Sequence, residues 1–263
     1  MKAVLVSAGV APDRLVDLSH DLPAHGVEEA AFLLREMARG FPPDTVHVAV
    51  VDPGVGGRRR AVAVVTRAGP LLVGPDNGVL APLAEELGLS AAFRIEATRL
   101  HRPNRIGTTF DGRDVFAPAA ALLAQGWDPA ELGPPVTPAR YVLPSPERTP
   151  TGAVGEVLHV DRFGNLITNI PTRWVRAGVS RMTVRFATGS GRELPWVTSY
   201  EAIGRGSLGC LGSSFGLVEL AVREGRASDR LRARVGSAVG LEWGQTPAST
   251  SANAKSARPR KRR

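Results

Sequence analysis

A proline-rich break at residues 133–152 divides this chain into two parts with different sequence patterns. The break holds six prolines and little apolar periodicity, which is typical of a linker because proline lacks the backbone donor that helices and sheets use. A chain of 263 residues is long enough for two small domains with separate cores. The pattern therefore predicts a first domain at residues 1–140, a linker at 141–152 and a second domain at 153–243.

The first part alternates apolar strands with amphipathic helices. The helix expected at residues 27–39 places Val27 and Leu34 on one face. The other expected helices are 79–87 and 114–125, and the expected strands are 46–51, 61–66, 71–73 and 93–95. Because strands that alternate with helices commonly form parallel units, the pattern predicts an α/β domain with a mainly parallel sheet.

The second part consists of short strands separated by glycine-rich turns. The expected strands are 154–160, 166–170, 182–186, 217–223 and 231–235. Closely spaced short strands tend to pair with their neighbours in an antiparallel way. The pattern therefore predicts a small all-β antiparallel barrel.

Most of the positive charge lies at the end of the chain. Residues 244–263 hold two lysines and four arginines without an acid, so they carry six of the eight net positive charges. The segment is rich in small and polar residues without periodicity, and we expect a disordered basic tail. The tail either only aids solubility, which we favour, or makes weak, salt-sensitive contact with a nucleic acid.

The composition also disfavours some kinds of protein. The single Cys210 excludes a disulfide within the chain and a cysteine-cluster metal site, and the five histidines show no metal-ligand spacing. No apolar run approaches the ~18 residues that span a bilayer, and no secretory signal opens the chain. We therefore expect a cytoplasmic protein without a metal and without membrane contact.

The loop after the strand expected at residues 46–51 carries the first candidate site. Asp52 is followed by a proline, which keeps the aspartate backbone extended, and then by Arg58, Arg59 and Arg60. Arginines in a loop at a strand end pair with carboxylates or bind anions, so we favour a functional carboxylate here. The alternative is an aspartate that caps its own loop beside a solvated basic face, and we expect at least one arginine to be solvated.

Two further segments carry polar residues beside expected elements. Asp111 and Asp114 precede a helix, where aspartate is a common N-cap, and we favour that simpler role for Asp114. The run from Asp161 to Asn165 joins two strands, and the amide of Asn165 has the donor and acceptor needed to read an adenine edge. A turn of this composition also forms without a ligand, so both interpretations stay open.

Four sequence motifs, in order, relate the chain to one family. They are VHVAVVDPGVG, GPDNG, TFDGRD and DRFGNLITN. Together they make residues 1–243 resemble the S-adenosyl-L-methionine hydroxide adenosyltransferases, relatives of the fluorinases and chlorinases. The resemblance implies an α/β N-terminal domain joined to a β-barrel. It also implies homotrimers whose active sites lie between the first domain of one subunit and the second domain of the next.

The resemblance further implies a reaction and its catalytic residues. S-adenosyl-L-methionine is hydrolysed to adenosine and L-methionine by attack of water on the ribose C5′, without a cofactor. Asp52 and Arg59 match an aspartate and an arginine that position and activate the water, and Asp111 stands where the family usually has a histidine. Because halide-using members carry tyrosine at the position of Asp52, the chain resembles the water-using branch, and a halogenase is the least expected function.

The residues that the resemblance assigns to substrate binding lie in the second domain. Asp161 and Ser214 match residues that hold the methionine amino-acid group. Asn165 matches the residue that reads adenine, with Phe163 packed beside it. Tyr200 is expected to stack on the base.

The chain departs from the family pattern in two places. Asp111 replaces the histidine, and two carboxylates beside one water repel each other unless Arg59 offsets their charge, so we expect a slower enzyme with a shifted pH optimum. The family usually begins with a strand and a TDFG-x-x-D-x-YVG segment whose first aspartate binds the ribose, and Met1 aligns after that segment. We favour a start codon that lies upstream over a protein that is truly shortened.

Two other functions stay open on these grounds. The protein could bind S-adenosyl-L-methionine or adenosine without turnover, because of the two departures, and tight binding without product would identify this case. Alternatively, it associates with a nucleic acid through its basic tail, and salt-dependent binding that vanishes on deletion of residues 244–263 would identify that case.

Overall fold

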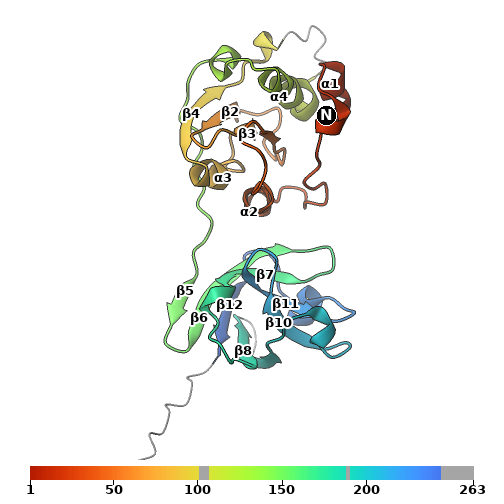
Figure 1. Ribbon diagram of the computed structural model, residues 1–263, viewed down its shortest axis with the longest axis vertical. Helices are drawn as coiled ribbons and strands as arrows, with labels where there is room; N and C mark the ends of the chain where they lie inside the picture. Colours follow the sequence, from red (N-terminus) through yellow and green to blue (C-terminus); the bar gives the residue numbers. More distant parts are fainter. Residues whose placement is uncertain (101–106, 188–189, 244–263) are drawn as a thin grey trace, which may run out of the picture.

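The computed structural model describes residues 1–100, 107–187 and 190–243 of the chain. The tail expected to be disordered, residues 244–263, therefore lies outside the described residues. An α/β part comes first along the chain and a β-barrel second, and a single connecting segment joins them (Figure 1). We refer to these two parts as the α/β half and the barrel.

The α/β half is built on a mixed sheet of four strands. They are β1 (Val46–Val48), β2 (Ala61–Thr66), β3 (Leu71–Pro75) and β4 (Leu89–Arg94), in the spatial order β1-β3-β2-β4. Among these described strands only β1 and β3 run parallel, so the expectation of a mainly parallel sheet is wrong. The reason is the turn at residues 67–70, which joins β2 directly to β3, whereas a parallel neighbour needs a crossover of about a dozen residues or more.

Helices cover both faces of this sheet (Figure 1). The alternate side chains of β2 are buried on opposite faces. Val62 packs with Leu83 on one face, and Ala63 packs with Phe116 on the other. The expected helices are confirmed with shorter ends. The helices are α1 (Lys2–Ser7), α2 (Val27–Met37), α3 (Ala81–Glu86) and α4 (Ala117–Ala124), with a π-helical turn (Gly112–Phe116) before α4.

The barrel confirms the expected all-β antiparallel architecture. Its strands pair in the order β10-β11-β7-β6-β12-β8-β9, with β5 beside β6, and all of these pairs are antiparallel. A bridge between Trp196 and Cys210 joins the two ends of this order, so the barrel is nearly closed. The strands are β5 (Glu147–Thr149), β6 (Gly152–Val160), β7 (Leu166–Pro171), β8 (Arg181–Phe186), β9 (Arg192–Pro195), β10 (Leu208–Gly212), β11 (Leu217–Val222) and β12 (Ala238–Glu242).

The strand expected at residues 231–235 is wrong. The helix α5 (Ala227–Leu231) ends there at Arg232, whose backbone is left-handed with a φ of 50°. The barrel uses β12 instead. Arginines alternate with apolar residues in LRARV, which imitates a half-buried strand, whereas AVGLE contains a glycine that lowers its strand propensity.

Helix α2 packs against the barrel and forms contacts between the two halves. Phe32 of α2 meets Phe215 of the barrel edge to face, with the ring centroids 5.5 Å apart. The same apolar cluster includes Ile167 of β7. The carboxylate of Glu29, also on α2, bonds to the ring of His159 in β6. The two halves therefore share both an apolar contact and a polar one.

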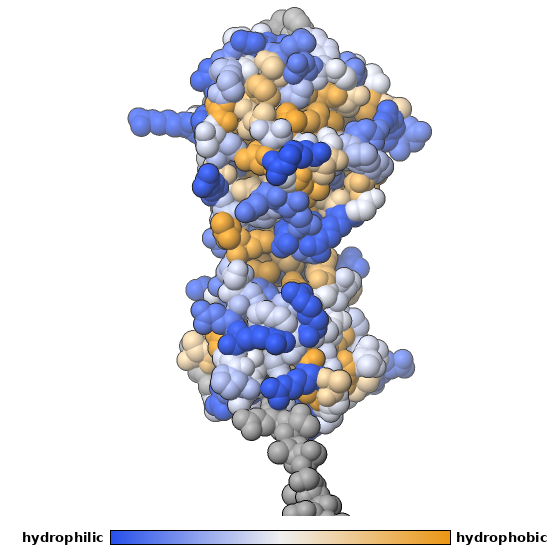
Figure 2. Space-filling model, turned by 60° about the vertical axis from the view of Figure 1, so that its left-hand side comes forward, coloured by the Kyte–Doolittle hydropathy of each residue, from blue (hydrophilic) through white to orange (hydrophobic). Residues whose placement is uncertain are grey.

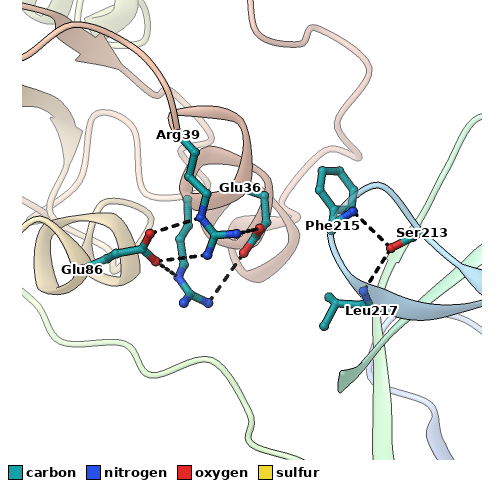
Figure 3. Close-up of polar contacts among 7 residues, drawn as sticks. Glu36, Arg39, Glu86, Ser213, Phe215 and Leu217 are labelled. Carbon is teal, nitrogen blue, oxygen red and sulfur yellow. Dashed lines mark hydrogen bonds and ion pairs between the residues drawn. The ribbon is translucent and has the colours of Figure 1, made fainter. Parts of the chain in front are cut away.

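Figure 3 shows α2 between its neighbours. On one side Arg39, just after α2, donates to Glu86 of α3 at 3.2 Å. On the other side lie Phe215 and Leu217, from the hairpin between β10 and β11. The ion pair between Arg39 and Glu86 holds α2 against its own half, and the apolar face of α2 packs against the barrel. In the part of the chain that the structure describes, no helix is long and apolar enough to cross a membrane.

Candidate functional site

The three residues expected to be catalytic form one ion cluster in the α/β half, which we call the acid–arginine cluster. Asp52 follows β1, Arg59 precedes β2 and Asp111 precedes the π-helical turn. The Nε of Arg59 lies 2.8 Å from Oδ1 and 2.9 Å from Oδ2 of Asp52. The Nη2 of Arg59 donates to Oδ2 of both Asp52 and Asp111. One guanidinium therefore holds two carboxylates that are far apart in the sequence.

The acid–arginine cluster is largely shielded from solvent. The side chains of Asp52 and Asp111 are 5% and 8% exposed, and that of Arg59 is 12% exposed. Burial disfavours the charged guanidinium, but the hydrogen bonds and charges of both aspartates outweigh it and raise the pKa of Arg59. The ring of Phe116 covers the guanidinium, with its centroid 5.2 Å from Cζ. The acid–arginine cluster therefore combines two carboxyl groups with one guanidinium.

A glycine and an asparagine shape the loop that carries Asp52. Gly56 has a φ of 76°, and a side chain there would meet the backbone oxygen of Thr108 at 3.2 Å. Glycine therefore lets the loop approach the Thr108 segment closely. From the other side, Nδ2 of Asn77 donates to the carbonyl of Val51 at 2.9 Å. The GPDNG motif thus holds the chain immediately before Asp52.

The other charged candidates of this region have different partners. Asp114 lies within the π-helical turn rather than at its N-cap, so the N-cap role expected for it is wrong. It is buried and pairs with Arg113, whose Nε lies 2.8 Å from Oδ1. Arg60 pairs with Asp76 at 2.7 Å. Arg58 is exposed, which agrees with the expectation that at least one arginine of the loop is solvated.

A second group of candidates lies on the barrel, at the turn between β6 and β7. Oδ1 of Asp161 accepts from the backbone N–H of Asn165 at 2.8 Å, and Oδ2 accepts from its Nδ2 at 3.0 Å. Gly164 supplies a φ of 82°, and a side chain there would meet Arg226 at 2.7 Å. The turn is therefore stable by its own bonds, as the simpler interpretation expected. It also presents an aromatic ring to solvent, because Phe163 is 61% exposed, with the guanidinium of Arg162 over the ring and its Cζ 4.7 Å from the centroid.

Tyr200 lies near the same turn and binds a residue that the sequence analysis missed. It begins a short 3-10 turn (Tyr200–Ala202), and its hydroxyl donates to Oε1 of Glu219 at 2.6 Å. Glu219 lies in β11 and is 3% exposed. Burial raises the pKa of both groups, and the nearby charge of Asp161 raises it further. We call Asp161, Asn165, Tyr200 and Glu219 the barrel group. The missed signal was an acid inside the apolar run LVELAV.

Ser214 lies at the tip of the hairpin between β10 and β11 and is exposed. Its neighbour Ser213 has a local role, because its hydroxyl oxygen accepts from the backbone N–H of Phe215 at 3.3 Å and of Leu217 at 3.4 Å (Figure 3). Ser213 therefore shapes the hairpin and leaves Ser214 open to solvent.

The expected catalytic residues thus form one cluster in the α/β half, and Asp161, Asn165 and Tyr200 lie together on the barrel, whereas Ser214 lies apart from them at the hairpin between β10 and β11. A cavity of about 440 Å³ lies between α3, β2 and residues 137–142, and its lining includes neither group. Among the described residues, no set of three or more histidine, cysteine, aspartate or glutamate side chains is arranged to hold a metal ion.

Comparison with protein families matches both parts of the chain. Residues 1–133 match the SAM hydroxide adenosyltransferase N-terminal domain, and residues 155–240 match the SAM hydroxide adenosyltransferase C-terminal domain. The matches therefore cover the acid–arginine cluster and the barrel group.

Individual relatives and solved structures agree with these matches. The chain is 40% identical over 250 residues to the (R)-S-adenosyl-L-methionine hydrolase of Thermus thermophilus, covering 92% of each protein. It is 28% identical over 197 residues to a fluorinase of an Actinoplanes species, covering 64% of this chain and 66% of the fluorinase. An uncharacterized conserved protein from Thermotoga maritima has a similar crystal structure, with a TM-score of 0.82 and 32% identity over 92% of this chain and 93% of the other.

Proposed function

The chain belongs to the SAM hydroxide adenosyltransferase family, and we propose that it hydrolyses S-adenosyl-L-methionine (SAM) to adenosine and L-methionine. The relatives named (R)-S-adenosyl-L-methionine hydrolase, from Thermus thermophilus and Salinispora arenicola, are each 40% identical to it over more than nine-tenths of the chain. The structural observation that carries the proposal is the acid–arginine cluster, because hydrolysis at a sulfonium centre needs a group that accepts the proton of water.

The proposed reaction is an in-line displacement at the ribose C5′. A water oxygen forms a bond to C5′ as the C5′–S bond breaks, and both electrons of that bond leave with the sulfur of methionine. The leaving group is a neutral thioether, so it needs no proton. The proton of the attacking water passes to a carboxylate of the acid–arginine cluster, Asp52 or Asp111. Arg59 keeps both carboxylates in place and offsets their mutual repulsion.

The proposed substrate site uses the barrel group and its exposed neighbours. A carboxylate has about four acceptor positions, so Asp161 can bind the methionine ammonium while it keeps its bonds to Asn165. Asn165 reads the adenine edge in this proposal, and Ser214 contacts the methionine carboxylate. Phe163 and Tyr200, which are 61% and 48% exposed, supply the apolar surfaces that an adenine ring needs.

We further propose that the working form is a homotrimer in which the α/β half of one subunit faces the barrel of the next. The separation of the two groups between the halves supports this arrangement, and so does Phe110, which is 64% exposed directly beside Asp111. Hydrophobic surface also shows at the junction of the two halves in Figure 2, and association would bury such surface. Light scattering after size-exclusion chromatography should give three times the mass of one chain.

We propose that the reaction takes place in the cytoplasm, because the chain has a single cysteine and so no disulfide within it. Weak contact of residues 244–263 with nucleic acid stays a proposal, supported by their charge alone.

The direct test is incubation of SAM with the purified protein and chromatography of the products. Adenosine and methionine should appear in equal amounts. Because Asp111 stands in place of the usual histidine, we expect turnover to be slow, so the incubation should use enzyme at substrate-like concentrations.

One observation favours a second function, binding of SAM or adenosine without turnover. Asp52 accepts bonds from Arg59 through both carboxylate oxygens, which leaves it less able to activate a water than a free acid. Binding of SAM measured by calorimetry, together with an unchanged SAM pool after long incubation, would favour the binder over the hydrolase.

A further inference from the structure

Two polar side chains, His159 and Glu219, lie on the two strands that flank β7 in the barrel. His159 of β6 pairs in register with Ile167 of β7, and Ile167 pairs with Glu219 of β11. Residues that stand opposite each other on paired strands point to the same face. Glu219 therefore lies on the face that also carries His159, two residues before Asp161.

The burial of Glu219 calls for an explanation. A carboxylate that is 3% exposed is costly unless it is hydrogen-bonded. Its Oε1 accepts from the Tyr200 hydroxyl at 2.6 Å, and its neighbours on the barrel include His159, which itself bonds to Glu29 of α2. An apolar residue would fill this strand position at a lower cost in free energy. Packing alone therefore does not explain the acid at this position.

Tyr200 is held in an unusual way. Its ring is 48% exposed, yet its hydroxyl is tied to a buried acid. The backbone before it is also fixed, because Oγ of Ser199 accepts from the N–H of Ala202 at the start of the same 3-10 turn. The ring therefore stands at the surface in one orientation, beside Asp161.

We propose that Glu219 is a positioning residue, which holds the Tyr200 hydroxyl so that the tyrosine ring forms a rigid wall of the SAM site. This proposal rests on the proposed function. Of these two residues only Tyr200 contacts the substrate, and Glu219 acts through it. A ring that is already fixed loses little conformational freedom when the adenine binds, so the bond improves substrate affinity rather than the chemical step.

The electrostatics of the neighbourhood agree with this division of roles. Burial and the adjacent Glu219 raise the pKa of Tyr200, so the phenol stays protonated and remains a donor at any physiological pH. The groups that face Glu219 are Tyr200 from the 3-10 turn, Asp161 from the turn after β6, and His159 from β6. The hydrogen bond from Tyr200 partly offsets the effects of burial and of Asp161 on this acid.

The test separates loss of the bond from loss of the residue. Tyr200→Phe removes one oxygen and keeps the ring, Glu219→Leu removes the acceptor, and Glu219→Gln keeps an acceptor of the same size. We expect the first two variants to raise the KM for SAM about 5- to 10-fold, the usual worth of one such bond, with kcat within about twofold. Glu219→Gln should restore a KM close to that of the unchanged protein. The double variant Tyr200→Phe/Glu219→Leu should be no worse than either single one.

A matched control is Tyr141→Phe, which removes the same atom from the other tyrosine of the chain, in the segment before β5. It should leave KM unchanged. The positioning role is wrong if Tyr200→Phe keeps the KM of the unchanged protein, or if its effect and that of Glu219→Leu multiply in the double variant. Tyr200→Phe keeps the comparison valid even if Glu219→Leu fails to fold. If the unchanged protein neither binds nor hydrolyses SAM, the proposed function itself fails, and this role fails with it.

Discussion

The acid–arginine cluster and the barrel group both bury carboxylates, but they stabilise them differently. Asp52 and Asp111 share the permanent charge of Arg59. Glu219 has only the neutral hydroxyl of Tyr200 as its hydrogen-bond donor in the described contacts, with Asp161 nearby as a like charge. A shared cation holds two acids close together, as the proposed proton transfer requires. A neutral donor fixes orientation without supplying charge, which suits binding.

In the proposed mechanism, the acid–arginine cluster carries out proton transfer and the barrel group binds the substrate. Changes in the acid–arginine cluster should act on kcat, and changes in the barrel group should act on KM. The following experiments test that separation, in order of decreasing expected effect.

The largest effect is expected from Arg59→Leu. It leaves two buried carboxylates without their cation, so kcat should fall by about a thousandfold or more and the free energy of unfolding should drop by about 3 kcal/mol. Steady-state kinetics and urea unfolding measure the two effects. The exposed Arg58→Leu is the matched control and should change neither. Full activity in Arg59→Leu would remove the acid–arginine cluster from the mechanism.

Asp52→Asn compared with Asp161→Asn tests the separation directly. The first should lower kcat by about 10²- to 10⁴-fold, because it removes a proton acceptor, with little change in KM. The second should raise KM about tenfold, because it weakens a charge-assisted bond to the substrate ammonium, with kcat nearly kept. The asparagine oxygen can still accept from the Asn165 backbone, so the turn should persist. The same kinetic pattern in both variants would contradict the account.

The variant Asp111→His tests whether the aspartate at position 111, where the family usually has a histidine, limits the rate. Restoring it should raise kcat by several-fold and move the pH optimum, because a neutral imidazole removes the repulsion between two acids at one water. Rates measured across pH 5–9 check both effects. A lower turnover in this variant would show that Asp111 is not the cause of the slow reaction.

The smallest effect concerns stability and pH. Burial raises the pKa of Glu219 above its ordinary value of 4.5, so the folded state prefers the protonated form. That contribution to stability is complete below about pH 4.5 and is lost as pH rises through the folded-state pKa. Glu219→Gln imitates the neutral form and avoids the loss. Its Tm relative to the unchanged protein should therefore be more favourable at pH 8 than at pH 4, while the exposed control Glu224→Gln should show no such trend.

The acid–arginine cluster was predictable because its residues follow strand ends in compact motifs. VDPGVGGRRR and TFDGRD each place a charged residue directly beside a regular element. The three residues meet in the structure because Gly56 of the first motif allows the two loops to approach closely. Their catalytic roles are proposals that the kinetic experiments test.

Other features were not predictable for identifiable reasons. Alternating strands and helices suggested a parallel sheet, but the four-residue turn between β2 and β3 decides the direction, and its closure depends on local hydrogen bonds such as that from Thr66 to Pro70. β10 reads LGCLG, and its glycines lower the strand propensity, so the sequence did not predict this strand. Gly209 is needed there because the side chain of Ile203 occupies the space that a Cβ would fill. Glu219 was missed because the sequence shows only a lone acid in an apolar strand. Its partner Tyr200 lies elsewhere in the chain, and only the fold brings the two side chains together.

The central claim is that water attacks C5′ with a carboxylate of the acid–arginine cluster as the proton acceptor. It is tested most directly by a single turnover of SAM in H₂¹⁸O, followed by mass spectrometry of the adenosine and of the protein. The account predicts adenosine that carries one ¹⁸O at its 5′-oxygen and a protein without label. Unlabelled adenosine with ¹⁸O in a carboxylate of the protein would mean that an aspartate attacks C5′ itself, and it would contradict the account.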